Sequence, residues 1–456
     1  MIKINKFKVI NKADIEFGLI NIEKTTKGSI NIIAGNNSSG KTTLSKCLYS
    51  VLGSLSNESY EIYETELKRL YYRLDADIFR FIRSHRKYEK DSQQNNLFGD
   101  NDSQKLFDDL ILELNNLRRE LSKITHNLDY GTNEISSVIE KIKDIFQHNN
   151  VQDYKIEKSI ENTLNGLKTK ENKIKRSEEI IQMLFNKEFG ETYNDFFNNN
   201  ISLFSTKNLN DPLLSLSSSN MYNDSLTDLV IGDIYYFETP FILDFFNNCN
   251  SPFGRKCEFE TYHQSSLVKK LSQKPFEWQF NTDSRVENPK KILSGIISGN
   301  LHFDNKKGFM FKNNQGDFII KNTAAGVKSI AMLLSLFDDL DDNSFLIMDE
   351  PEVHLHPLWQ IKLAEAIVVM AKIRKIHFHI NSHSPQFIEA IDTYGNFYDL
   401  DNIRYYLAKE NGENTFNIEE ILQADLVEIY NHFGDPYDEL DRVRAKTRVK
   451  NATKDD

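Results

Sequence analysis

A strand-like apolar run followed by a loop framed by two glycines is the stretch of this chain best suited to bind phosphate. Residues Ile30–Ala34 read as a buried strand, and the next eight residues have the form G-x-x-x-x-G-K-T. Gly35 and Gly40 allow a tight backbone turn in which successive N–H groups point at one anion. The positive end of a helix that begins near Lys41 lies behind them. This is the P-loop pattern, in the strand-then-helix context that makes it specific.

The P-loop side chains have expected roles in binding a nucleoside triphosphate. Lys41 would reach the β- and γ-phosphates, and the Thr42 hydroxyl would hold Mg²⁺. The residues predicted to bind nucleotide here are Gly35, Asn36, Asn37, Ser38, Ser39, Gly40, Lys41, Thr42 and Thr43. An ordinary Gly/Ser turn before a helix is the competing interpretation, and the presence of both the strand and the helix disfavours it. ATP and Mg²⁺ are therefore the predicted ligands.

An acidic pair at the end of a second apolar strand supplies the other half of the predicted site. The run Phe345–Met348 ends in Asp-Glu-Pro-Glu, which is the Walker B arrangement. Asp349 is expected to bind Mg²⁺ together with Thr42, and Glu350 to polarise the attacking water. A strand that ends in a solvated acidic turn is the alternative, and it is weak beside this P-loop.

A further strand, at residues 376–380, leads into Asn-Ser-His-Ser-Pro. His383 follows the end of that strand and is placed to reach the γ-phosphate. The predicted catalytic residues are therefore Glu350, His383 and Lys41. His377 and His379 alternate within the strand, and we expect them to be structural.

Together these motifs resemble the ABC-type ATPase heads of the Rad50, SMC, RecF and OLD group. The resemblance rests on Gly35–Thr42, on D-E-P-E followed by H-L-H-P, and on N-S-H-S-P, and it covers residues 1–50 and about 300–395. D-E-P-E-x-H-L-H-P followed by a strand and S-H-S-P is also similar to AAA-labelled ATPases of bacterial defence islands. The resemblance implies an α/β fold. This fold is an ABC-type P-loop ATPase head with a helical or coiled-coil insertion, in which His383 is the switch histidine.

The group also requires a signature loop that opens a helix and completes the nucleotide site of a partner protomer. The best match is Asn322–Ser329, where Ala324 and Ala325 replace the serine and the first glycine of the usual L-S-G-G-Q. Gly326 and Lys328 are the residues expected to contact nucleotide, Gly326 through a backbone N–H at the helix start.

The rest of the chain must position these motifs. We expect 1–95 to be the N-terminal part of the head, 96–190 a helical or coiled-coil arm, 191–300 a mixed linker that returns to the head, 301–400 the C-terminal part of the head, and 401–456 a C-terminal extension and tail. An antiparallel strand pair is expected at 2–17, loop at 198–225, β-structure at 229–243, a hairpin around 313–316, and a loose tail over the last fifteen residues.

Apolar residues at alternating three- and four-residue steps predict a heptad seam in the arm. They are Leu106, Leu110, Leu114, Leu117, Leu121, Ile124 and Leu128. We expect a helical hairpin or a three-helix arm. Two arrangements stay open, an arm that projects from the ATPase body and a helical subdomain packed flat against it.

Composition limits the classes of function. The 456 residues carry a net charge of −11, which argues against broad, non-specific nucleic-acid binding but leaves a local basic groove open. No apolar run approaches the roughly 20 residues that span a bilayer, and no signal-peptide pattern opens the chain. Three cysteines without a C-x-x-C pair disfavour a disulfide framework. A cytoplasmic location is expected.

The resemblance implies an ATP-binding and ATP-hydrolysing sensor or regulatory subunit of an anti-phage defence complex. Examples are PtuA of Septu and its retron-associated relatives, and AriA of PARIS. Such subunits form homo-oligomers through their heads and control a separate effector nuclease, which is expected here to be of the HNH type. Contact with DNA or a phage component stays open. About seventy residues follow Pro385 and show no Toprim nuclease pattern, so no fused nuclease is expected.

Two other classes of function are alternatives. A RecF- or SMC-like ATPase that clamps DNA in repair is the alternative, and the acidic net charge argues mildly against it. A membrane-transporter subunit is disfavoured by the weak signature loop and the large insertion.

Overall fold

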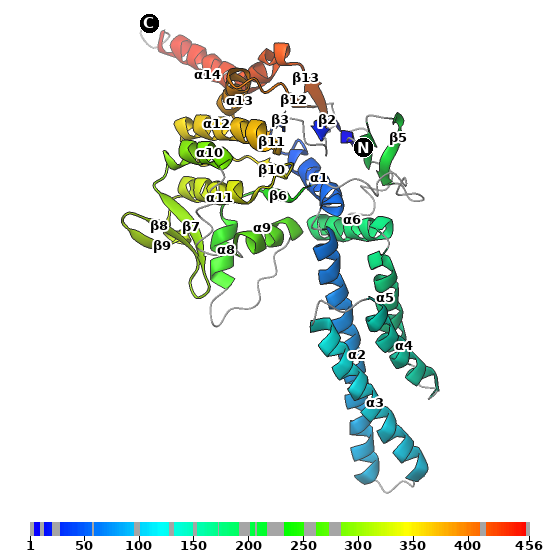
Figure 1. Cartoon of the computed structure of the whole chain (residues 1–456). Helices are drawn as coiled ribbons and strands as arrows, with labels where there is room; N and C mark the ends of the chain where they lie inside the picture. The colour runs from blue at the N-terminus through cyan, green and yellow to red at the C-terminus, as the bar shows by residue number, and fades with distance from the viewer. Residues whose placement is uncertain are drawn as a thin grey trace. The chain divides into compact units, whose positions relative to one another are not determined.

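A computed structural model of the chain is shown in Figure 1. It describes residues 4–9, 13–20, 28–56, 59–94, 101–126, 132–148, 153–171, 173–190, 201–205, 208–216, 232–249, 261–272, 284–410 and 416–452. The chain divides into two compact units. The first combines Met1–Asn57 with Ile181–Asp456, and the second is Glu58–Ile180.

The first unit is built on a large sheet of ten described strands in the order β5-β4-β1-β2-β13-β12-β3-β11-β10-β6. The strands are β1 (Ile4–Val9), β2 (Ala13–Ile20), β3 (Ser29–Ala34), β4 (Ile201–Ser205), β5 (Asn208–Leu216), β6 (Ile234–Phe237), β10 (Phe345–Asp349), β11 (His377–Ser382), β12 (Ile403–Glu410) and β13 (Phe416–Ile421). The run β12-β3-β11-β10-β6 is parallel throughout. The predicted α/β class is confirmed, and so is the antiparallel pair near the N-terminus.

The register of the parallel strands brings three sequence motifs to one edge of the sheet. Ala34, at the end of β3, pairs with Ser382 of β11, and Asn381 of β11 pairs with Asp349 of β10. Because parallel strands end on the same side, the P-loop, the acidic pair and the loop that carries His383 all begin at this edge. Residues far apart in sequence are thereby gathered into one site.

Helices lie on both faces of this sheet. The helices of this unit include α1 (Lys41–Leu55), α8 (Ile242–Cys249), α9 (Tyr262–Ser272), α10 (Ser284–Ser294), α11 (Ala325–Asp339), α12 (Pro357–Arg374), α13 (Pro385–Phe397) and α14 (Val427–Ala452). Alternate strand residues such as Ile32, Met348 and Ile380 enter the main core, which α11, α12 and α13 cover. Figure 1 shows α1 on the other side of the strands, where Asn381 contacts Ser45 of α1.

The two histidine–proline motifs are helix starts. His356 is the N-cap of α12 and Pro357 its first residue, while the Ser384 hydroxyl accepts a hydrogen bond from the Phe387 N–H at the start of α13. Proline fits the first helical position because its missing N–H would have no partner there. Both helices therefore begin at a defined residue directly after the site-forming strands.

A small antiparallel sheet precedes the predicted signature loop. It consists of β7 (Gly299–Asp304), β8 (Gly308–Asn313) and β9 (Gly316–Ile319), and the hairpin predicted around 313–316 is confirmed as the β8–β9 turn. The Asn313 side chain accepts hydrogen bonds from the N–H groups of Gln315 and Gly316, which holds the turn.

The second unit is helical. Its helices are α2 (Ser59–Gln94), α3 (Asn101–His126), α4 (Thr132–His148), α5 (Tyr154–Glu171) and the first part of α6 (Lys173–Phe189). Of the predicted seam, Leu110, Leu114, Leu117 and Leu121 lie on α3 and are buried. Ion pairing adds to this packing, since Arg118 of α3 binds Asp75 of α2 at 2.6 Å.

The structure corrects several expectations about elements. The unit division falls at residues 57/58 and 180/181, so α2 groups with the helical unit instead of the head. The stretch expected to be loop at 198–225 contains β4 and β5, and within the stretch expected to be β-rich at 229–243 the described residues form β6 before α8 begins. The described part of the expected tail is helical, since α14 extends to Ala452. Among the described helices, none is both long and apolar enough to cross a membrane.

Candidate active site

The P-loop backbone requires glycine at both ends for different reasons. At Gly35 the φ angle is 148°, and an added Cβ would lie 2.7 Å from the Cβ of Ala408 on β12. Gly40 has a φ of 86° and is the N-cap of α1. Both conformations are ones that other residues rarely adopt. Among the loop residues, Asn36, Asn37, Ser38, Gly40 and Thr43 are exposed and Ser39 is buried.

Lys41 lies inside the loop. Its ammonium group donates to the carbonyl oxygens of Gly35 and Asn36 at 2.9 and 2.8 Å and contacts the Ser39 hydroxyl at 3.3 Å. Burial lowers the pKa of Lys41, and the negative charge of Glu350 acts in the opposite direction. The positive charge of Lys41 is therefore held where the loop backbone turns.

Thr42 and Asp349 meet at the centre of the site. The Thr42 hydroxyl donates to Asp349 Oδ2 at 2.6 Å, and the Asn381 amide donates to Asp349 Oδ1 at 2.8 Å. The same amide also donates to the Ser45 hydroxyl at 2.9 Å. A hydroxyl and a carboxylate are oxygen ligands of the kind that Mg²⁺ prefers. This donor pair therefore fits Mg²⁺.

Glu350 and His383 form a second close pair. His383 Nε2 lies 2.6 Å from Glu350 Oε1. Burial lowers the pKa of His383, as does the charge of Lys41, while the carboxylate of Glu350 opposes them, so the neutral imidazole is favoured. Glu350 has a φ of 50°, a left-handed conformation that costs about 1–3 kcal/mol in a non-glycine residue. Its N–H donates to the carbonyl of Asn381 at 2.9 Å, which helps to hold this conformation.

A buried carboxylate connects the acidic turn to the histidine loop. Glu352 Oε1 accepts from the Ser382 hydroxyl at 2.6 Å and from the His383 N–H at 3.0 Å. Burial raises the pKa of Glu352 to about 6, even though these hydrogen bonds act to lower it. The contact fixes the backbone of His383 relative to the end of β10.

The residues predicted for the signature loop have other contacts in this chain. The buried Lys328 pairs with Asp244 of α8 at 2.6 Å. Gly326 faces the turn after Glu352, and a Cβ there would lie 2.8 Å from the carbonyl oxygen of His354. The structure therefore brings Lys41, Thr42, Asp349, Glu350 and His383 together, and places the predicted signature loop against α8 and the H-L-H-P turn.

Three supporting residues were not identified from the sequence. Asn381 and Glu352 lie inside quoted motifs, but their roles depend on strand register. Tyr236, whose hydroxyl lies 3.5 Å from Asp349 Oδ2, belongs to an apolar strand that carries no recognisable signal.

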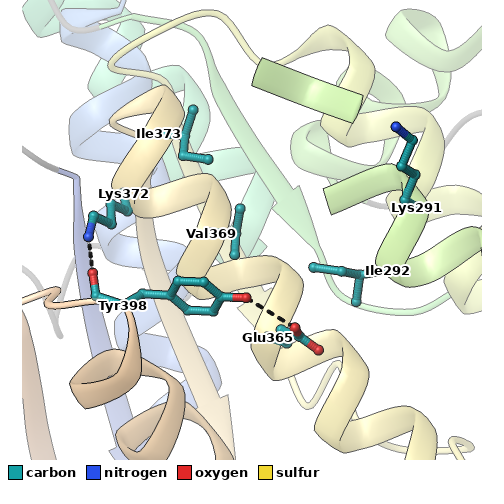
Figure 2. Close-up of a pocket in the computed structure, with 7 residues that line it drawn as sticks. All are labelled: Lys291, Ile292, Glu365, Val369, Lys372, Ile373 and Tyr398. Carbon is teal, nitrogen blue, oxygen red and sulfur yellow. Dashed lines mark hydrogen bonds between the residues drawn. The ribbon is translucent and has the colours of Figure 1, made fainter. Parts of the chain in front are cut away.

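A pocket of about 320 Å³ lies elsewhere, between α10 and α12, and Figure 2 shows its lining. Ile292, Val369 and Ile373 are its apolar residues. Tyr398 donates from its hydroxyl to Glu365 at 3.1 Å, and its carbonyl accepts from Lys372. None of the predicted site residues line this pocket.

Solved structures with similarity to the chain include heads of Smc proteins. The Smc head domain with a coiled coil and joint from Pyrococcus yayanosii is 11% identical, with 94% of this chain and 99% of that chain covered and a TM-score of 0.33. The Smc head domain with an extended coiled coil bound to the C-terminal domain of ScpA, from Pyrococcus furiosus, has the same identity and coverage and a TM-score of 0.32. The SmcHead bound to the C-winged helix domain of ScpA is 13% identical, with a TM-score of 0.26. The similarity covers 36% of this chain and 56% of that chain, so this chain spans about half the length of the SmcHead chain.

No curated protein matches the sequence. A protein-family model, in contrast, matches residues 30–389, a range that contains the P-loop, the acidic pair and His383. Because this match extends over most of the 456 residues, the chain belongs to the family described as "AAA domain, putative AbiEii toxin, Type IV TA system".

Proposed function

We propose that this chain binds ATP with Mg²⁺ at the P-loop and hydrolyses it. The observation that carries the proposal is the 2.6 Å contact between Thr42 and Asp349, which joins the phosphate-binding loop to the acidic strand end. Family membership supports the same conclusion.

Each residue of the site has a chemical task in this proposal. The loop N–H groups and Lys41 bind the phosphates, and Thr42 and Asp349 hold Mg²⁺. The bound metal would neutralise charge on the phosphate oxygens. Glu350 orients and polarises the attacking water. The single N–H of neutral His383, which meets Glu350 in this structure, would donate to the γ-phosphate instead when nucleotide is bound.

We further propose that the site is completed by a second copy of the chain. Gly326 packs against the H-L-H-P turn and Lys328 pairs with Asp244 of α8, so these contacts are separate from the P-loop contacts described above. Large apolar side chains are exposed in this region. They are Phe241, whose ring centroid lies 5.6 Å from the Lys328 ammonium, and Val353 and Leu358, which precede and follow the H-L-H-P turn. A face of this kind suits association between heads, with the signature loop of one copy over the nucleotide of another.

The cellular role we propose is regulation of a separate effector, a nuclease, in an anti-phage defence complex. The family description names a toxin–antitoxin system, which supports a setting in which one component restrains another. Septu-type systems with an HNH nuclease, in which the ATPase is PtuA, are the specific setting proposed.

Affinity purification of the tagged chain, expressed with the products of its neighbouring genes, tests this role. Recovery of an ATPase oligomer with a nuclease, in a ratio set by mass measurement, is the expected result. Glu350→Gln would then show which nucleotide state releases cleavage. An ATPase recovered alone that dimerises only with ATP and retains DNA would overturn the defence role and favour the DNA-clamping alternative.

A further inference from the structure

A buried histidine lies between two carboxylates near the acidic strand end. His263 of α9 is 1% exposed. Its Nδ1 lies 2.6 Å from Glu188 Oε2, and its Nε2 lies 3.0 Å from Glu238 Oε2. Glu238 is also bound by Gln264 at 3.0 Å and by Lys46 of α1 at 3.6 Å. Four elements are joined here, because Glu188 is near the end of α6 and Glu238 follows β6.

The charges of this cluster support one another. Burial alone would lower the pKa of His263, but the two carboxylates outweigh it and raise the pKa. Burial alone would raise the pKa of Glu238, but the hydrogen bond and charge of His263, with Lys46 and Gln264, lower it to about 2. The imidazole is therefore held in one orientation by charged partners on both ring nitrogens.

The imidazole stacks on Tyr236 of β6. The two ring centroids are 4.4 Å apart with an angle of 27° between the planes, and Tyr49 of α1 packs at 5.9 Å from each ring. The Tyr236 side chain is buried, and its hydroxyl lies 3.5 Å from Asp349 Oδ2. That oxygen is the one that Thr42 contacts. Burial, with the charge of Asp349, raises the pKa of Tyr236, so the hydroxyl remains a donor.

A purely structural aromatic core would not require this hydroxyl. A phenylalanine would fill the same volume and stack equally well, and a buried hydroxyl costs free energy unless it has a partner. The partner that the structure gives is a predicted magnesium ligand. The ring stack therefore determines where a hydrogen-bond donor meets that carboxylate.

We propose that Tyr236 is a positioning residue for Asp349, and that Glu188, His263 and Glu238 hold Tyr236 in place, so that the end of α6 influences Mg²⁺ binding at the nucleotide site. This inference rests on the proposed ATPase function. It adds a connection between the end of α6 and Asp349, the predicted magnesium ligand, that lies outside the sequence motifs.

The substitution Tyr236→Phe tests the hydroxyl while keeping the ring and its stack. Tyr235→Phe is the matched control, because Tyr235 is the neighbouring buried residue of β6 on the opposite face, in the main core. Two quantities are measured in the full chain, the Mg²⁺ concentration that half-saturates ATP hydrolysis and the Mg²⁺ dependence of binding of a fluorescent ATP analogue. For Tyr236→Phe we expect both half-saturating concentrations to rise about threefold or more and turnover to fall, with little change in the KM for ATP.

His263→Leu tests the support behind Tyr236. It should raise the Mg²⁺ requirement in the same way, and the double substitution with Tyr236→Phe should show less than the product of the two single effects, since both act through one contact. Full multiplicativity of the two effects would overturn the proposed connection.

The failures of the two proposals are distinguishable. Suppose that the wild-type chain binds and hydrolyses ATP, and that Tyr236→Phe and Tyr235→Phe have the same Mg²⁺ dependence. This result would overturn the present inference alone. A wild-type chain that does not bind the ATP analogue would overturn the ATPase function and this inference with it.

Discussion

At the scale of residues, the site combines groups that a short sequence motif identifies with groups whose role depends on how the strands pair. The P-loop and the acidic pair could be predicted because their chemistry requires a fixed order of residue types after a strand. Asn381 and Glu352 could not be assigned roles, because only the register of β11 against β10 and β3 brings their partners within reach. The same register buries His377 and His379, which the sequence analysis expected to be structural.

His379→Leu should reduce the pH dependence of stability. Burial lowers the pKa of His379 to about 3, and among the described residues neither ring nitrogen has a hydrogen-bond partner. Stability is therefore complete above the unfolded pKa of about 6.5 and is lost as the pH falls toward the folded value, by about 1.4 kcal/mol per unit. Between pH 7 and pH 5, the stability of the variant relative to wild type should therefore rise by ~2 kcal/mol in urea unfolding.

His148→Leu, which removes an exposed histidine of α4, is the control for the loss of an imidazole at the surface. His377 and Glu352 titrate in both proteins and cancel in the comparison. If the difference in unfolding free energy between His379→Leu and wild type is the same at pH 7 and at pH 5, His379 does not titrate in a buried, unpartnered state.

At the scale of elements, the parallel strands and the helices that follow them were predictable from apolar runs with clear ends. The errors occurred where pairing across long separations decides structure. β4 and β5 lie in an Asn/Ser-rich stretch, and β4 forms because it pairs with β1 about two hundred residues earlier. The charged pattern of α14 resembles a tail because much of that helix is exposed. The essential link between elements is Glu352, which ties the end of β10 to the end of β11.

Ser382→Ala should lower turnover without weakening ATP binding. Removal of the hydroxyl leaves Glu352 with one fewer donor and frees the His383 loop, a loss of about 1–2 kcal/mol that corresponds to a five- to thirtyfold fall in kcat. Ser344→Ala is the matched control, since Ser344 precedes β10 and its buried hydroxyl has no hydrogen-bond partner among the described residues. Steady-state kinetics that show a higher KM for ATP with an unchanged kcat would contradict the role given to this link.

At the scale of the whole molecule, the sequence predicted an ATPase head interrupted by a helical insertion, and the structure contains two compact units. The boundary was placed too late because α2 lacks the leucine-rich seam of α3, although both helices belong to the same unit. What joins one copy to another is a proposal that depends on the exposed face around the signature loop.

Glu350→Gln should trap an oligomer in the presence of ATP and Mg²⁺. Without hydrolysis, nucleotide held between two heads persists, so the molar mass from light scattering should at least double relative to the nucleotide-free protein. The additional substitution Lys41→Ala should restore the nucleotide-free mass by preventing phosphate binding. A mass that does not respond to ATP would rule out nucleotide-dependent association of the heads.

Thr42, Asp349, Glu350 and His383 are proposed to form an ATP-hydrolysing site, and parallel measurement of ATP binding and phosphate release in wild type and Glu350→Gln tests this proposal. We predict that the variant binds ATP within a few-fold of wild type and releases phosphate at least about 100-fold more slowly, since loss of a positioned base costs roughly that much. Equal phosphate release by the two proteins, or a wild type that does not bind ATP, would show that these residues do not form such a site.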